Sequence, residues 1–162
     1  MKGKIYPLTD LLKQLAVWRK EEKKIVFTNG CFDILHLGHI DYLSRAADAG
    51  NVLIIGVNSD NSVRRLKGSG RPINNQQART TVLAALQFVD AVVIFDEDTP
   101  YELIKALQPD VLVKGKDYQV EEIAGHDIVL SRGGQVITIA LTQGYSTTDL
   151  IKKLTDHRKQ DG

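Results

Sequence analysis

Two of the four histidines of this chain lie three residues apart, in the run His36-Leu37-Gly38-His39. The run follows a short apolar segment and leads into a stretch with helical spacing, which indicates the start of a helix. In the first helical turn, residues i and i+3 share the face toward which free backbone N–H groups and the positive end of the dipole point. Gly38 leaves room for an anion to approach the backbone. The spacing therefore predicts a phosphate site.

Histidines in a first helical turn also serve as caps or as packed core residues, without any chemistry. Here the pair is accompanied by Asp33 and follows an apolar segment directly, at a position where ligand sites of α/β proteins occur. Gly30 predicts a tight turn between that segment and the helix. The chain has neither a Gly-x-Gly-x-x-Gly nor a Walker A spacing, so a dinucleotide fingerprint and a P-loop are excluded. The combination favours a phosphate site of another kind.

A basic stretch, Arg64–Pro72, is predicted to be a loop that contains Gly68 and Gly70. Most charged runs of this length are simply solvated. The two glycines instead favour a mobile arm that closes over bound phosphates. Lys67 and Arg71 are then its expected phosphate ligands.

Three further candidates lie at helix starts or strand ends. Arg79 falls near the start of a predicted helix, where the dipole disfavours a cation, so its position favours an external anionic partner. Ser146-Thr147-Thr148 opens the last predicted helix and offers hydroxyls and backbone N–H groups to a phosphate, although the same residues also suit an ordinary cap. Lys114–Tyr118 follows a predicted strand and is either a wall of a pocket or a surface turn.

The elements that must position these residues are short β-branched runs alternating with longer stretches of helical apolar spacing. The predicted strands are Ile25–Thr28, Val52–Val57, Ala91–Phe95, Val111–Lys114 and Val136–Ala140. The predicted helices cover about residues 8–20, Ile40–Ala49, Gln76–Phe88, Tyr101–Leu107 and a shorter piece near Ile128–Arg132. Asn74, Thr99 and Ser146 are the expected N-caps. The strands are apolar at nearly every position, as is typical of parallel strands covered on both faces.

This alternation predicts an α/β fold built as a single-domain, doubly wound, parallel five-stranded sheet. In such a sheet the ligand crevice lies beyond the carboxyl ends of the strands, where the strand order reverses. No repeat or composition shift marks a second domain, so residues 1–162 are expected to form one domain with a frayed tail over about 156–162. The candidate residues follow strand ends and should therefore meet in that crevice.

Composition excludes several classes of protein. The 162 residues include 21 Lys+Arg against 20 Asp+Glu, so no nucleic-acid or membrane partner is indicated by charge. Cys31 is the single cysteine and cannot form an intramolecular disulfide, and no Cys/His spacing suits a metal, so no direct metal ligation by the protein is expected. No signal peptide or membrane-spanning run is apparent. We therefore expect a cytoplasmic protein.

The spacing Gly30-x-Phe32-Asp33-x-x-His36-x-Gly38-His39 resembles the signature of the HxGH nucleotidyltransferase superfamily, which has a Rossmann-like fold. Within it, the chain is most similar to the bacterial heptose 1-phosphate adenylyltransferases, which make ADP-heptose for lipopolysaccharide. The similarity runs roughly from Ile5 to Lys153. It includes Val57–Asp60, Arg65–Gly68, Arg71-Pro72, Arg79, Leu112–Tyr118 and Gly144–Thr148.

The resemblance implies that ATP, with Mg²⁺ on its phosphates, reacts with a sugar 1-phosphate to give an ADP-sugar and pyrophosphate. It implies catalytic roles for His36, His39 and Lys67, and acceptor-binding roles for Asp33, Arg79 and Asp117. The expected nucleotide-binding residues are Asn29, Gly30, Cys31, Phe32, Gly38, Arg71, Lys114, Gly115, Ser146, Thr147 and Thr148. Relatives commonly form homodimers, and a separate sugar kinase is expected upstream.

Two departures from the wider superfamily bear on specificity. Cys31 stands where many relatives have Ser or Thr, which removes a hydroxyl contact to phosphate but leaves the backbone N–H. Similar cytidylyltransferases carry an arginine at the position of Leu141 and another near Gln87, where these groups suit a cytosine edge. Their absence here favours adenine. The alternative is a cytidylyltransferase that acts on glycerol or ethanolamine phosphate.

Overall fold

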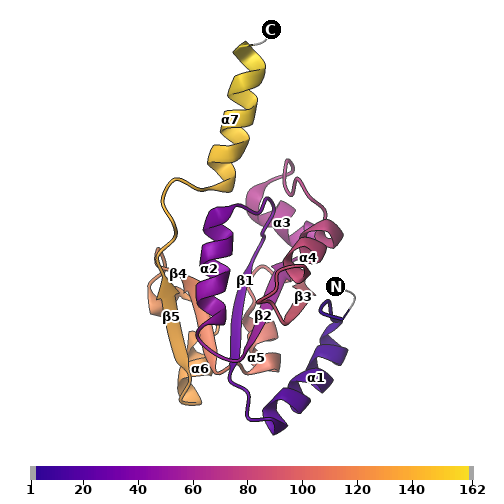
Figure 1. The fold of residues 1–162 in the computed structure, drawn as a ribbon, viewed down its shortest axis with the longest axis vertical. Coiled ribbons are helices and arrows are strands. Elements are labelled where there is room, and N and C mark those ends of the chain that lie inside the picture. The colour runs from indigo at the N-terminus through magenta and orange to yellow at the C-terminus, as the bar shows by residue number, and fades with distance from the viewer. Residues whose placement is uncertain (1–2, 161–162) are drawn as a thin grey trace.

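The computed structural model describes the backbone of residues 3–160 and the side chains of residues 3–156. Its centre is a five-stranded sheet with the order β3-β2-β1-β4-β5, in which every pairing is parallel (Figure 1). The strands are β1 (Ile25–Gly30), β2 (Val52–Asn58), β3 (Ala91–Phe95), β4 (Val111–Gly115) and β5 (Gln135–Ile139). The predicted fold class is confirmed, and each predicted strand lies within two residues of the observed one.

Helices cover both faces of the sheet. They are α1 (Leu8–Lys20), α2 (Leu37–Ala47), α3 (Asp60–Lys67), α4 (Gln76–Ala84), α5 (Tyr101–Leu107), α6 (His126–Ser131) and α7 (Thr147–Gln160), with a short 3₁₀ helix η1 at Val120–Glu122. Successive strand residues point to opposite faces, so Phe27 joins a core with α1, α5 and α6, and Val26 joins a second core with α2 and α4. Two buried cores on one sheet define the doubly wound arrangement.

The strand order places a switch point between β1 and β4. From β1 the chain proceeds through α2 to β2 on one side, whereas β4 pairs with the other edge of β1. The crossover helices diverge on the two sides, which opens a crevice beyond the carboxyl ends of these strands. The loop after β1 and the helix α2 lie at this crevice.

Helix α3 corrects the prediction of a loop over Arg64–Pro72. The segment is helical to Lys67, and Ser59 caps the helix by accepting a hydrogen bond from the backbone N–H of Ser62 at 3.0 Å. Only the part from Gly68 onward is non-helical. Val63 is the one buried apolar residue of α3, and a short polar helix of this kind has no apolar periodicity to reveal it.

Two predicted caps are also wrong. Asn75, not Asn74, caps α4, since the Asn75 side chain accepts from the backbone N–H of Ala78. Pro100, not Thr99, precedes α5 and makes no side-chain cap. In addition, α4 ends at Ala84, so the helix predicted to Phe88 is four residues shorter than expected. The predicted Ser146 cap is confirmed, because Ser146 Oγ accepts from the backbone N–H of Asp149 at 3.0 Å.

Helix α7 rises away from the sheet and the other helices (Figure 1). None of the residues Thr147–Asp156 is buried. The helix runs to Gln160, so part of the segment for which a frayed tail was expected is helical, and residues 161–162 lie outside the described residues. Within residues 3–160, no helix combines the length and apolar character that crossing a membrane would need.

Candidate functional site

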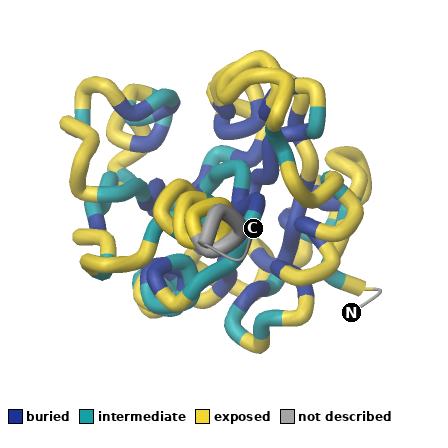
Figure 2. The backbone as a smooth tube through the Cα atoms, turned by 90° about the horizontal axis from the view of Figure 1, so that it is seen from above, coloured by how far each residue is buried: buried dark blue, intermediate teal, exposed yellow. Residues whose placement is uncertain are grey.

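A cavity of about 620 Å³ lies at the carboxyl ends of the strands, at the predicted switch point. Figure 2 looks down on this end of the molecule, with α7 seen along its axis. Segments that follow each of the five strands contribute to the wall. The cavity is large enough for a nucleotide-sized ligand.

Nearly all of the predicted site residues line this cavity. They are Asn29, Gly30, Cys31, Phe32, Asp33, His36, Gly38, His39, Lys67, Arg71, Lys114, Gly115, Asp117, Ser146, Thr147 and Thr148. Arg79 is the exception. The chain therefore brings together residues that are more than a hundred positions apart in sequence.

The two histidines form a stacked pair at the start of α2. Their ring centroids lie 3.9 Å apart with an interplanar angle of 29°, and His36 occupies the N-cap position. In both rings Nδ1 is buried and has no hydrogen-bond partner among the described residues. A neutral ring that carries its proton on Nε2 would leave no buried N–H unpaired at Nδ1. Each ring then offers an N–H donor from Nε2.

Burial lowers the pKa of both histidines. The effect on His39 is the larger, because burial and the neighbouring His36 together lower its pKa to about 4. The pKa of His36 is lowered by burial alone. Both rings are therefore neutral at pH 7 in the ligand-free protein, and an anion bound beside them would raise their pKa values.

Gly38 makes the stacked pair possible. A Cβ atom at this position would lie 3.0 Å from Nδ1 of His36 and 3.3 Å from Cβ of Tyr145. A larger residue would therefore push the His36 ring or the loop before α7 out of place. The need for glycine arises here from side-chain packing, in addition to the close approach of an anion predicted from the sequence.

The turn between β1 and α2 depends on Phe32 rather than on Gly30. Phe32 has a left-handed φ of 48°, whereas Gly30 has no left-handed φ. A Cβ on Gly30 would lie 3.0 Å from the Phe32 ring, so the glycine makes room for that ring. The ring in turn meets His39 edge-on, with centroids 5.6 Å apart at 65°. The turn therefore helps to position the second histidine.

The Asp33 side chain is hydrogen-bonded to the loop before α4. Its carboxylate accepts from Arg71 Nε at 2.7 Å and from the backbone N–H groups of Ile73 and Asn74, both at 2.8 Å. Burial alone would raise its pKa, but the N–H groups of Asn74 and Ile73 and the Arg71 guanidinium together hold the pKa below its ordinary value. These contacts do not support the expected role of Asp33 in positioning the acceptor or a metal-bound water. They also pair Arg71, an expected phosphate ligand, with an internal carboxylate.

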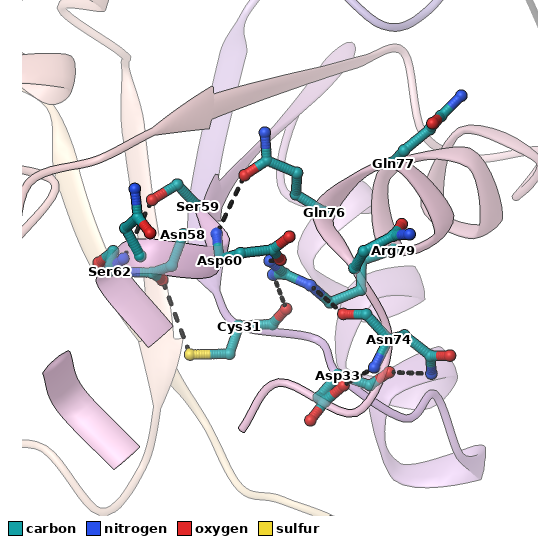
Figure 3. Close-up of polar contacts among 12 residues, drawn as sticks. Cys31, Asp33, Asn58, Ser59, Asp60, Ser62, Asn74, Gln76, Gln77 and Arg79 are labelled. Carbon is teal, nitrogen blue, oxygen red and sulfur yellow. Dashed lines mark hydrogen bonds and ion pairs between the residues drawn. The ribbon is translucent and has the colours of Figure 1, made fainter. Parts of the chain in front are cut away.

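Arg79 is not among the residues that line the cavity, which corrects its predicted role in substrate binding. Its side chain points toward Asp60, Cys31 and Asn74 (Figure 3). Its side chain has no exposed surface, and Nη2 pairs with Asp60 Oδ1 at 2.8 Å. Its remaining donors bind the backbone carbonyls of Cys31 and Asn74. The anionic partner expected for this cation is therefore internal.

Two lysines approach the cavity from opposite sides of the switch point. Lys114, at the end of β4, has its pKa lowered by burial, and its Nζ lies 3.5 Å from the carbonyl oxygen of Asn29. Its Nζ also lies 5.4 Å from the ring centroid of Tyr118. Lys67 is the last residue of α3 and lies in the wall. Both can meet phosphate oxygens as point charges.

The hydroxyl cluster before α7 lies beside the histidine pair. Ser146 caps the helix, and Thr147 Oγ1 donates to the carbonyl of Ile34 at 3.4 Å. Tyr145 stacks on His36 with centroids 6.4 Å apart. The N-terminus of a 14-residue helix thus enters the cavity next to that of α2. Two helix N-termini at one place favour an anionic ligand.

Sequence reasoning missed the part of the wall that follows β3 and η1. Asp98, Thr99 and Pro100 line the cavity, as do Glu122, Ile123 and Ala124. The rule that ligand sites lie at the carboxyl ends of strands could have identified the first three. Gln87, one of the two positions expected to bear on base selection, is exposed and lies outside the cavity wall, whereas Leu141 lies in it.

The part of the chain described by the structure contains no group of three or more His, Cys, Asp or Glu residues arranged to hold a metal ion. Asp33, the carboxylate in the turn that precedes the histidines, already has three donors. The donor set therefore does not suit a resident metal held by the protein alone.

Comparison with known proteins agrees with this architecture. The family model described as cytidylyltransferase-like matches residues 27–153. The bifunctional protein HldE of Nitrobacter winogradskyi is 56 % identical over 144 residues, which are 89 % of this chain and 30 % of that protein. The HldE of Campylobacter concisus is 53 % identical over 157 residues, 97 % of this chain and 31 % of that protein. The chain thus spans less than a third of the length of these relatives.

Two solved structures share the fold. A lipopolysaccharide core biosynthesis protein of Thermoplasma volcanium has a TM-score of 0.61 at 27 % identity, covering 76 % of this chain and 99 % of that one. A pantoate-β-alanine ligase of Francisella tularensis has a TM-score of 0.60 at 18 % identity, covering 91 % of this chain and 75 % of that one. The second likeness concerns the fold alone.

Proposed function

The chain belongs to the cytidylyltransferase-like family, and we propose that it is an adenylyltransferase that joins ATP to a sugar 1-phosphate. The sugar is D-glycero-β-D-manno-heptose, and the products are ADP-heptose, for the lipopolysaccharide core, and pyrophosphate. The observation that carries the proposal is the stacked pair of histidines at the N-terminus of α2, inside the cavity. The heptose itself comes from the family resemblance of the sequence.

The reaction is an in-line displacement at the α-phosphorus of ATP. A phosphate oxygen of the sugar 1-phosphate forms a bond to that phosphorus, and the bond to the oxygen bridging to the β-phosphorus breaks. Pyrophosphate leaves with Mg²⁺, which enters as part of the ATP substrate. Such chemistry needs positioning and charge stabilisation more than a protein nucleophile, and the cavity supplies neutral donors, cations and helix N-termini.

We assign the roles according to position. His36 and His39 donate from Nε2 to the α-phosphate and to the bridging oxygen as negative charge grows there. Ser146, Thr147 and Thr148 bind the leaving pyrophosphate at the N-terminus of α7. Lys67 approaches the phosphates from the end of α3, beside Gly68.

Adenine is assigned to the side of the cavity that follows β4 and β5. Leu141 is 55 % exposed, yet it lies in the cavity wall. Its Cδ1 lies 3.7 Å from the place that a Cβ added to Gly115 would take. An apolar side chain open to a ligand cavity suits the flat face of a purine. Asn58, the last residue of β2, and Asp98 and Thr99, which follow β3, offer polar atoms to the hydroxyls of the acceptor.

Three further assignments complete the proposal. A reaction that forms a sugar 1-phosphate must precede this one, and we assign it to a sugar kinase activity. We place both reactions in the cytoplasm, where ATP is available. We also propose a homodimer, because α7 has no buried residue among Thr147–Asp156 and helices of this length are marginal in water without packing.

Base selection tests the nucleotide assignment. We expect kcat/KM for ATP to exceed that for CTP by roughly tenfold to a hundredfold, because a cytosine edge beside Leu141 would lack polar partners. Leu141→Arg should lower the ratio of kcat/KM for ATP to kcat/KM for CTP. Leu130→Arg, which changes an exposed leucine of α6 outside the cavity wall, should leave it unchanged.

Steady-state rates of pyrophosphate release with both nucleotides, across a panel of sugar and polyol phosphates, measure this ratio. Equal or higher kcat/KM with CTP would replace the proposal by the alternative of a cytidylyltransferase acting on glycerol or ethanolamine phosphate.

A further inference from the structure

A buried arginine behind the cavity joins three segments that form its wall (Figure 3). Arg79 lies in the first turn of α4, and its three guanidinium nitrogens bind three different acceptors. Nε donates to the carbonyl of Asn74 at 3.0 Å, Nη1 to the carbonyl of Cys31 at 2.6 Å, and Nη2 to Asp60 Oδ1 at 2.8 Å. No exposed surface remains on the side chain, so it cannot touch a ligand in this arrangement.

Each acceptor belongs to a segment with a place in the site. Cys31 begins the turn after β1 and lines the cavity. Asn74 is anchored to Asp33 from both its backbone N–H and its Nδ2. Asp60 is the first residue of α3, the helix that ends at Lys67. One side chain therefore ties the histidine turn, the loop before α4 and the lysine helix together.

The hydrogen bond from Arg79 to the carbonyl of Cys31 bears on the position of the catalytic residue His39. Phe32, the next residue, has a left-handed φ of 48°, a conformation that a bulky side chain keeps only when its surroundings impose it. Its backbone N–H donates to no backbone carbonyl among residues 3–160. Its ring meets His39 edge-on at 5.6 Å. Displacement of the Cys31 carbonyl would thus move both this N–H donor and the neighbour of His39.

We propose that Arg79 is a positioning residue for nucleotidyl transfer, which holds the turn at Cys31 and Phe32 so that His39 meets the reacting phosphate. This inference rests on the proposed function, and it assigns Arg79 a role without contact to either substrate. The planar guanidinium is essential to it, because one ammonium nitrogen cannot reach three acceptors that lie in three directions. The ion pair with Asp60 stabilises the folded protein, whereas the hydrogen bonds to the carbonyls of Cys31 and Asn74 hold the turn in position.

The two roles separate in a pair of variants. Arg79→Lys keeps the positive charge near Asp60 but loses the hydrogen bonds to the two carbonyls. We therefore expect kcat to fall by roughly tenfold or more, while KM for ATP changes by less than about threefold. Asp60→Asn keeps the arginine and both carbonyl bonds, so it should lower Tm but leave kcat within about threefold of wild type. Arg132→Lys, which changes an exposed arginine bonded to the carbonyl of Gln108, is the matched control.

Amide hydrogen exchange supplies a readout that does not depend on turnover. In the full chain with ATP and Mg²⁺, the amides of residues 31–33 should exchange faster in Arg79→Lys than in wild type or Asp60→Asn. Unchanged exchange there, a kcat within twofold of wild type, or a loss of kcat that simply follows Tm in both variants would each overturn the proposal. If wild type itself formed no ADP-heptose, the proposed function would fail, and exchange at residues 31–33 would still decide whether Arg79 holds the turn.

Discussion

Replacing either His36 or His39 by alanine is expected to lower kcat by on the order of a hundredfold or more. Each ring donates one hydrogen bond that strengthens as charge develops on the phosphate, and loss of such a donor costs roughly 3 kcal/mol of transition-state stabilisation. The donors are pre-positioned, because the rings stack at 3.9 Å and both Nδ1 atoms are buried away from other partners. Binding of ATP should weaken much less, since other groups hold its remaining phosphates.

Single-turnover rates and equilibrium binding of ATP separate the two effects. His126→Ala is the matched control, because His126 lies at the start of α6 and outside the cavity wall. Both active-site variants should remain folded, since neither histidine belongs to the buried cores. Wild-type turnover in either variant would contradict the assignment of catalysis to this pair.

Replacing Asp33 by alanine is expected to produce the largest loss of stability, about 3 kcal/mol or more. The Asp33 side chain is only 1 % exposed and accepts from Arg71, Ile73 and Asn74. Its removal leaves a guanidinium and two backbone N–H groups without their acceptor. For a chain of this length, the loss corresponds to a fall in Tm of roughly 10 °C.

Urea unfolding at pH 7 measures this loss. Asp10→Ala is the matched control, because Asp10 pairs with Lys13 on the surface and should change stability by less than about 0.5 kcal/mol. A loss of less than about 1 kcal/mol in Asp33→Ala would show that the loop before α4 does not depend on this carboxylate.

Much of the fold could be predicted from the sequence because its strands are continuous apolar runs. Ala91–Phe95 and Tyr101–Leu107 match their predicted bounds, since buried parallel strands and amphipathic helices leave strong local patterns. Helix α3 left no such pattern, because only Val63 of its apolar residues is buried. Its stability comes from the Ser59 cap and from contacts with distant loops, which local spacing does not reveal.

In the site as well, features with a local sequence pattern could be predicted, and features that depend on contacts across the fold could not. The histidines, Ser146 and Lys114 lie in one cavity, as predicted, because each lies at or beyond the carboxyl end of a strand, and the carboxyl ends of parallel strands converge. Arg79 was misassigned because its partner Asp60 lies on another helix, and sequence alone does not show which charges meet across the fold. The internal contacts of Asp33 were equally hidden, since its three donors follow Gly70 in a loop without regular structure.

The most direct test of the account is product formation by the purified chain from ATP, Mg²⁺ and D-glycero-β-D-manno-heptose 1-phosphate. We expect equal amounts of pyrophosphate and ADP-heptose, because one phosphorus–oxygen bond forms for each that breaks, and little product from CTP with glycerol 3-phosphate. Phosphorus NMR of the reaction mixture identifies both products at once. Formation of CDP-glycerol in preference to ADP-heptose, or the absence of any ADP-sugar across a panel of sugar 1-phosphates, would contradict it.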